Sequence, residues 1–149
     1  MAKTYRLGTA RRLANRVFQW MTSHGIGARY RYILTVPGRK SGLAHSTPVD
    51  VMEIDGTRWL VAAYGIVGWV LNARAAGSVT LARGHWSERF RAEEVTGAEA
   101  LPVLRTYIHR VRVTRGYFDA GPDAADEALL TDLRNHPVFR LEREEVSGA

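Results

Sequence analysis

The sequence predicts an α+β, mainly β protein built on a small antiparallel barrel, with helices packed outside the barrel. Short runs rich in β-branched and aromatic residues follow one another between glycine-containing turns. Amphipathic helical spacing precedes, interrupts and follows these runs. The 149 residues are enough for one hydrophobic core and too few for two ordinary ones, which suits a single barrel with a helical cover.

The first predicted element is a basic amphipathic helix from Leu7 to Ser23. Its apolar positions fall at three- and four-residue spacing: Leu7, Ala10, Ala14, Val17, Phe18 and Met21. Arginines flank this stripe, and the glycines of His24–Gly27 end the helix. We expect residues 1–27 to be part of one domain over residues 1–149, because the chain has no linker, repeat or low-complexity tract.

Three strands and a short helix are predicted next, over Tyr30–Val36, Thr47–Ile54, Thr57–Ala63 and Trp69–Ala76. Pro37-Gly38 breaks the first strand, and Asp55-Gly56 is a two-residue hairpin signal between the second and third. Gly77 is the expected C-terminal cap of the helix.

The rest of the chain predicts two strands, two helices and a last strand, over Ser78–Ala82, Ser87–Val95, Ala98 to about Arg112, Pro122–Asn135 and Val138–Leu141. Acidic residues in the first turns of the Pro122–Asn135 helix suit its dipole. His136-Pro137 is expected to stop this helix. Spacing leaves open whether the strands close into a complete barrel.

Composition narrows the classes of function. The chain has no cysteine, so a disulfide framework, a thiolate metal site and a cysteine nucleophile are excluded. No apolar run approaches the roughly 20 residues of a membrane span, and the N-terminus lacks a signal-peptide core. We therefore expect a cytoplasmic protein. The histidines have no carboxylate at ligand spacing, so no metal site is predicted.

Charge is distributed unevenly along the chain. Residues 1–49 hold nine lysines and arginines and no acidic residue, whereas the remaining hundred hold twelve basic and fifteen acidic residues. The net charge of +6 therefore comes from the first third of the chain. This asymmetry predicts an anionic partner, which is either nucleic acid, an acidic membrane surface or a phosphorylated small molecule.

A candidate anion site lies in the turn Pro37–Gly42, whose sequence is PGRKSG. The glycines permit successive backbone amides to face one concavity. Arg39 offers a bidentate fork, Lys40 a point charge and Ser41 a neutral donor. Alternatively, this is a solvated hairpin turn whose basic residues serve solubility. The turn lacks the pattern of a nucleotide-binding P-loop.

The motifs around this turn occur in a specific order. Gly38-Arg39-Lys40-Ser41-Gly42 is followed by Thr47-Pro48-Val49, by a strand ending in Ala62-Ala63-Tyr64-Gly65, and by Trp69 and Asn72–Gly77. The sequence resembles the deazaflavin-dependent nitroreductase family, split-barrel oxidoreductases with an FMN-binding-like fold that bind coenzyme F420, an 8-hydroxy-5-deazaflavin. The resemblance runs from the arginine-rich N-terminal segment to the closing HPVFRLE.

The resemblance implies where the cofactor binds. In that family the basic turn holds the phosphodiester of the coenzyme, and the oligoglutamate tail runs toward basic surface. FMN is a less suitable ligand. His45 stands where family members often carry a basic residue, which weakens this phosphate contact near neutral pH. The expected cofactor-binding residues are Gly38, Arg39, Lys40, Ser41, His45, Ser46, Thr47, Pro48, Ala62, Ala63, Tyr64, Gly65, Gly68, Trp69 and Asn72.

Tyr64 and Tyr117 are the candidate catalytic residues, as proton donors or substrate-orienting groups. The resemblance implies a reductase that passes hydride from the deazaflavin C5 to a quinone, an enone or a nitro compound. Such a cofactor carries the difficult step, so no strong general acid is needed. Alternatively, both tyrosines are packing residues with satisfied hydroxyls.

Other functions stay open at this point. The same fold can hold a deazaflavin, a flavin or a tetrapyrrole-like ligand without turnover. The basic first helix permits peripheral attachment to anionic lipid. Nucleic-acid binding is not expected, because no recognised motif supports it. Pairing into a homodimer is also open, since split barrels often complete their core in this way.

Overall fold

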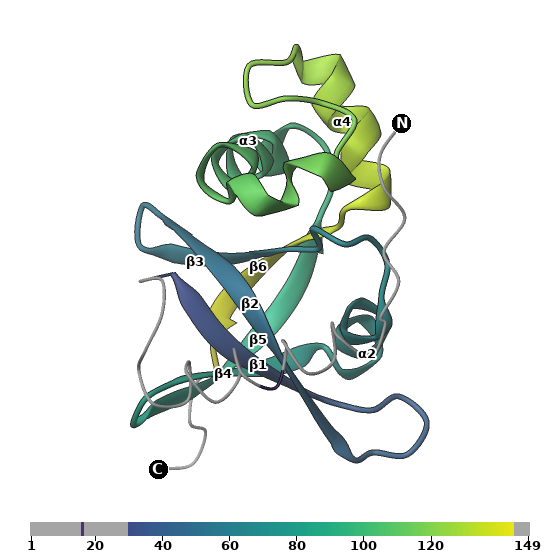
Figure 1. Cartoon of the computed structure of the whole chain (residues 1–149). Helices are drawn as coiled ribbons and strands as arrows, with labels where there is room; N and C mark the ends of the chain where they lie inside the picture. Colours follow the sequence, from purple (N-terminus) through teal and green to yellow (C-terminus); the bar gives the residue numbers. More distant parts are fainter. Residues whose placement is uncertain (1–15, 17–29, 145–149) are drawn as a thin grey trace.

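The computed structural model describes Arg16 and residues 30–144. Within these residues six strands close into an antiparallel barrel in the order β1-β2-β3-β6-β5-β4 (Figure 1). The pairing of β1 with β4 through Ile33, Leu34 and Thr35 completes the closure, so the predicted barrel is confirmed. The strands are β1 Arg31–Pro37, β2 Ala44–Ile54, β3 Thr57–Val61, β4 Ser78–Arg83, β5 Trp86–Val95 and β6 Val138–Arg143.

The helices cover the barrel from outside. In Figure 1, α3, η2 and α4 lie together above one end of the barrel, and α2 lies beside the other end. Their bounds are α2 Gly68–Ala76, η1 Ala98–Ala100, α3 Leu101–Arg110, η2 Arg112–Tyr117 and α4 Asp126–Asn135.

The β2–β3 turn forms as its sequence predicts. Asp55 has φ 51° and Gly56 has φ 79°, the two left-handed conformations that a two-residue hairpin of type I′ requires. Ile54 therefore pairs with Thr57. This turn fixes the register of both strands.

Several predicted element bounds differ from the structure, and three of the differences have a clear local cause. β2 begins at Ala44 rather than Thr47, because residues 44–46 pair with the end of β1. The helix predicted to reach about Arg112 ends at Arg110, and the chain continues as the 3-10 helix η2. The helix predicted from Pro122 begins at Asp126, because Arg105 donates to the Pro122 and Ala124 carbonyls and holds that segment as a loop.

Two apolar clusters form the core. One fills the barrel, with Leu34, Leu60, Leu81, Phe90 and Phe139 almost fully buried. The other joins the barrel wall to the helical cover, for example through Met52, Leu104, Ile108 and Leu129. Burial of each such side chain stabilises the fold by about 1.5–3 kcal/mol. The second cluster fixes where α3 and η2 stand over β2.

The predicted basic helix Leu7–Ser23 falls outside the described residues except for Arg16, whose side chain is exposed. Among the described residues, none of the helices has the length and apolar character needed to cross a membrane.

Candidate functional site

Two adjoining cavities form a groove along β2. The first, of about 550 Å³, lies against the β1–β2 turn and is called the loop cavity; its polar lining includes Arg39, Lys40, Ser41, His45, Ser46 and Asn72. The second, of about 260 Å³, is called the inner cavity; its polar lining includes Arg31, Thr47, Asp50, Tyr64, Tyr107 and Thr114. Thr47, Val67 and Trp69 line both cavities, so the groove is continuous.

The β1–β2 turn is closed by its own hydrogen bonds. The Gly38 amide donates to the Leu43 carbonyl at 2.8 Å, and the Gly42 amide donates to the Gly38 carbonyl at 2.9 Å. Gly42 adopts φ 73°, which glycine accepts without strain. These two amides are therefore used within the hairpin, and the glycine amides add no donor for an anion.

Asn72 of α2 anchors the turn. Its Oδ1 accepts from the Arg39 amide at 3.1 Å and from Arg39 Nη1 at 2.9 Å. Asn72 is only 7% exposed, whereas Lys40 and Ser41 at the tip of the turn are exposed. The helix therefore holds the base of the turn and the guanidinium of Arg39, while Lys40 and Ser41 remain accessible to a ligand.

Gly38 makes room for the polar floor of the loop cavity. A Cβ at this position would lie 2.8 Å from His45 Nε2 and 3.0 Å from Ser41 Oγ. The absence of a side chain lets the imidazole and the hydroxyl approach the backbone closely. Together with Arg39 and Lys40, they give a donor set that suits a phosphate or carboxylate group.

Most of the remaining predicted cofactor contacts also line the groove. Ser46 and Gly68 line the loop cavity, Pro48 and Ala63 line the inner cavity, and Trp69 lines both. The Trp69 ring also packs on Phe139 of the barrel core, with centroids 5.8 Å apart.

Ala62 and Gly65 are not lining residues of either cavity. Ala62 is buried with the barrel core, and its carbonyl accepts a hydrogen bond at 2.9 Å from Nδ1 of the buried His136. Gly65 has φ 92° and donates its amide to the Ala62 carbonyl. Both residues shape the end of β3 and contribute no surface to the groove.

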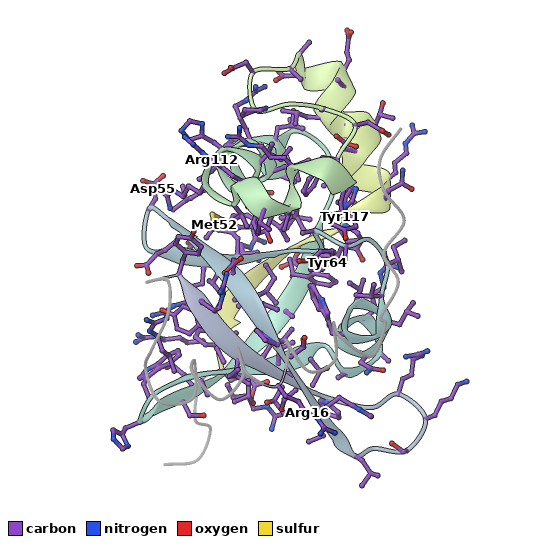
Figure 2. The ribbon with its side chains drawn as sticks, in the orientation of Figure 1. Arg16, Met52, Asp55, Tyr64, Arg112 and Tyr117 are labelled. Carbon is purple, nitrogen blue, oxygen red and sulfur yellow. The ribbon has the colours of Figure 1, made fainter. Side chains whose placement is uncertain are left out.

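The two candidate catalytic tyrosines meet but occupy different positions. Tyr64 and Tyr117 pack edge to face, with ring centroids 4.8 Å apart and planes at 85° (Figure 2). Tyr64 lines the inner cavity, whereas Tyr117 is not among its lining residues. Tyr117 therefore supports the ring of Tyr64 from η2.

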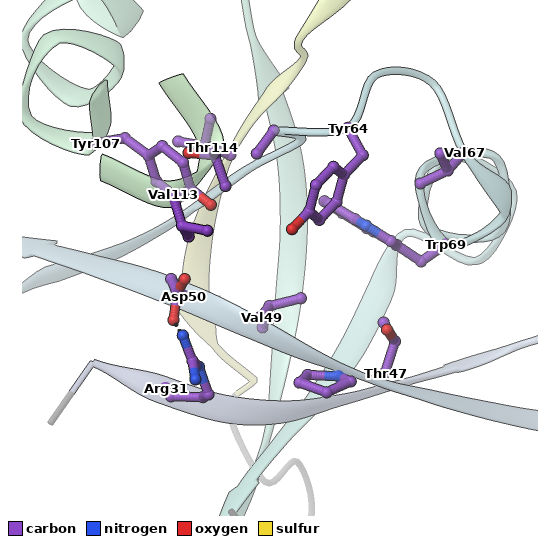
Figure 3. A pocket seen from close by; sticks show the side chains of 13 residues that line it. Arg31, Thr47, Val49, Asp50, Tyr64, Val67, Trp69, Tyr107, Val113 and Thr114 are labelled. Carbon is purple, nitrogen blue, oxygen red and sulfur yellow. Dashed lines mark hydrogen bonds and ion pairs between the residues drawn. The ribbon is translucent and has the colours of Figure 1, made fainter. Parts of the chain in front are cut away.

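Sequence reasoning missed the polar end of the inner cavity. Asp50 Oδ1 accepts from Arg31 Nε at 3.0 Å, and the two residues face each other across the β1–β2 register. Tyr107 enters from α3 and is 3% exposed. Figure 3 shows the Tyr64 and Tyr107 hydroxyls and the Asp50 carboxylate directed into one space. The signal in the sequence was Asp50 itself, a carboxylate between the two valines Val49 and Val51 of a predicted strand.

Burial sets the protonation of these groups. It raises the pKa of Tyr107 well above its ordinary value of 10.0, and the neighbouring Asp50 and Tyr64 act in the same direction. Burial also raises the pKa of Asp50, an effect that the hydrogen bond and the charge of Arg31 only partly offset. Tyr107 is therefore a neutral phenol at physiological pH and serves as a hydrogen-bonding group.

Residues 10–122, which are most of the chain, match the family model described as F420H(2)-dependent quinone reductase. The chain belongs to the F420H2-dependent quinone reductase family. It is therefore an oxidoreductase whose cofactor is coenzyme F420. The family resemblance drawn from the sequence is confirmed, and the family description names a quinone reductase where the sequence analysis named a nitroreductase family.

Solved structures share the fold of this F420H2-dependent reductase. One described as a domain-swapped dimer is 22% identical, with 89% of this chain and 96% of that chain covered and a TM-score of 0.59. An F420-H2-dependent reductase, FDR-A, is 21% identical over 76% of this chain and 95% of that chain, with a TM-score of 0.54. The heme storage protein HutZ from Vibrio cholerae is 12% identical over 78% and 83%, with a TM-score of 0.55. The comparison with curated proteins gives no match.

Proposed function

We propose that this F420H2-dependent reductase passes a hydride to an electron-poor conjugated acceptor, with quinones as the first class and enones or nitro compounds as the others. The observation that carries the proposal is the continuous groove, which has cations at one end and a phenol-lined cavity at the other. A long cofactor with an anionic arm and a planar ring requires such a groove.

The loop cavity is the proposed site of the cofactor's phosphodiester. Arg39 and Lys40 would supply charge-assisted hydrogen bonds, and Ser41 and His45 would add donors on the floor beside Gly38. Since Asn72 holds Arg39 in place, this part of the site is formed before the ligand arrives.

The shared wall of the groove is the proposed site of the deazaflavin ring. Thr47 and Trp69 would orient the ring, with Ala63 and Tyr64 beyond them. When bound, reduced F420 supplies the hydride, and the reduced acceptor takes up one proton. The Tyr64 O–H would donate that proton or hold the acceptor oxygen, and solvent would restore it. The buried walls of the inner cavity would exclude water from the reacting carbon.

A titration of the purified protein with oxidised F420, followed by tryptophan and cofactor fluorescence, tests the cofactor site. FMN and FAD serve as comparison ligands. We expect saturable binding of F420, weaker binding of the flavins, and roughly ten-fold weaker F420 binding in Lys40→Ala, since one charge-assisted hydrogen bond is lost. If Lys40→Ala bound F420 with unchanged affinity, Lys40 would not be a ligand of the cofactor's phosphodiester.

Oxidation of F420H2 in the presence of quinones, enones and nitro-aromatics tests the reaction. Turnover of a quinone supports the proposed reductase. F420 binding with no turnover of any acceptor class would instead favour the binding-module alternative.

A homodimer and peripheral contact with anionic membranes are two further proposals. A homodimer is supported by the relative described as a domain-swapped dimer, and light scattering on the purified protein tests it. Peripheral contact with anionic membranes depends on the predicted helix Leu7–Ser23, and vesicle co-sedimentation of an arginine-to-glutamate variant of that helix tests it.

A further inference from the structure

The far end of the inner cavity is polar, which a site for a purely apolar quinone does not need. Asp50 is paired with Arg31 there, and 10% of its side chain is exposed. Tyr107 and Thr114, at 3% and 2% exposure, complete this end. Asp50 and Thr114 each have a protein partner, and a ligand in the cavity can use the hydrogen-bonding capacity that remains.

The hydrogen bonds at this end leave acceptor capacity on Asp50. The bond from Arg31 Nε uses one of the roughly four that a carboxylate can accept. The Thr114 hydroxyl donates its proton to the Val111 carbonyl at 2.8 Å. Tyr107 lines the same end of the cavity, and its hydroxyl is directed into the same space as the Asp50 carboxylate (Figure 3).

We propose that the hydride acceptor of this enzyme carries a neutral hydrogen-bond donor, such as a hydroxyl or amide N–H, that binds the Asp50 carboxylate beside the Tyr107 hydroxyl. The inference rests on the proposed function and names the substrate class of that site. A carboxylate on the ligand has no proton to donate to Asp50, and it would lose its hydration in the cavity without a matching partner. A cation would gain little, because the Arg31 guanidinium already balances Asp50.

The test uses three probes of similar shape: 1,4-naphthoquinones that carry at carbon 2 a hydroxymethyl, an ethyl or a carboxylate group. Their dissociation constants are measured by tryptophan quenching, with and without oxidised F420. We expect the hydroxymethyl compound to bind about ten-fold more tightly than the ethyl compound, as for one hydrogen bond to a charged group. We expect the carboxylate to bind most weakly.

The double variant Arg31→Met/Asp50→Leu removes both charges together and leaves no unpaired ion. It should reduce the preference for hydroxymethyl over ethyl to within about two-fold. Asp50→Asn, with Arg31 unchanged, is the second variant should the double variant fail to fold, and it should reduce the preference less. Asp55→Asn, in the exposed β2–β3 turn, is the matched control and should keep the wild-type ratio.

Equal affinity of the wild type for the hydroxymethyl and ethyl compounds, or no measurable binding of either, overturns the proposal. So does a preference that survives intact in both variants. Because the ratio is also measured without cofactor, these outcomes differ from a failure of the proposed function, which would appear as absent F420 binding or absent turnover.

Discussion

At the scale of single residues, Gly38 decides how the polar floor of the loop cavity is built. The imidazole of His45 and the hydroxyl of Ser41 lie 2.8 Å and 3.0 Å from where its Cβ would be. Since no positive φ is required there, the constraint is one of close approach and not of backbone conformation.

Gly38→Ala should therefore weaken F420 binding and leave the fold intact. The new methyl group would push the exposed His45 and Ser41 side chains away from the cavity floor, and we expect a loss of affinity of roughly ten-fold. Fluorescence titration measures the affinity, and urea unfolding measures the stability. Gly121→Ala, where nothing lies within 4 Å of the added Cβ, is the control. Affinity equal to wild type would show that the two side chains are not needed on that floor.

The Arg31–Asp50 pair should reduce stability at neutral pH. Because burial raises the pKa of Asp50 above its ordinary value of 3.8, the folded state binds this proton more tightly than the unfolded state. The contribution of Asp50 to the free energy of unfolding is thus largest below pH 3.8 and is lost as pH rises through the folded-state pKa.

Arg31→Met/Asp50→Leu tests this sign. Near neutral pH the double variant should be as stable as the wild type or more stable, by up to about 4 kcal/mol. The advantage should shrink as the pH is lowered from about 7 toward about 4. Urea unfolding at several pH values measures it. An advantage that grows on acidification would mean that the pair stabilises the folded protein.

At the scale of elements, α2 and the β1–β2 turn act as one unit. The helix ends in a Gly77 cap with φ 70°, and its buried Asn72 reaches across to Arg39. A turn of five polar or small residues would otherwise have few contacts to hold it.

Asn72→Ala should weaken F420 binding several-fold and lower the free energy of unfolding by about 1–3 kcal/mol, because it leaves the Arg39 amide without its acceptor. Asn72→Asp is the informative partner variant. It keeps the acceptor and pairs with the Arg39 guanidinium, so it should preserve stability and still reduce affinity for a phosphate. Wild-type affinity in both variants would exclude Arg39 from the binding site.

The segment between η2 and α4 is held by one buried carboxylate. Asp132 of α4 is 1% exposed and accepts from the Asp119 amide at 3.0 Å and the Ala120 amide at 2.7 Å. Asp132→Ala leaves both amides unsatisfied and should lower the free energy of unfolding by about 2–4 kcal/mol in urea titrations. Glu127→Ala, at an exposed position on the same helix, should change it by less than about 1 kcal/mol. A similar effect of both substitutions would contradict the role of Asp132.

At the scale of the whole molecule, the groove exists because a helical layer is packed against the wall of a closed barrel. The barrel supplies β2 and the basic turn, α2 supplies Asn72 and Trp69, and the cover supplies Tyr107 and Thr114. His136 joins the layers by its hydrogen bond to the Ala62 carbonyl and its ring contact with Phe118, with centroids 4.2 Å apart. The contacts that stabilise the fold therefore also hold the side chains that line the groove.

The sequence by itself determined the strands, the β2–β3 turn and the basic loop, because these depend on local backbone preference and on the order of residues along the chain. Asp55-Gly56 is an example, since both residues must adopt positive φ and few other pairs do so easily. The candidate residues Arg39, Lys40 and Ser41 could likewise be identified from one short segment. Their family motif is contiguous, so no tertiary information was needed to find it.

Only the tertiary structure decided which side chains meet in the inner cavity. Arg31, Asp50 and Tyr107 come from β1, β2 and α3, and nothing in local spacing joins them. The same holds for Tyr117, which packs against Tyr64 from η2, a 3-10 helix that the sequence did not predict. The physical reason is that helix packing on a barrel is set by the shape of buried apolar surfaces, which bring distant residues together regardless of their spacing in the chain.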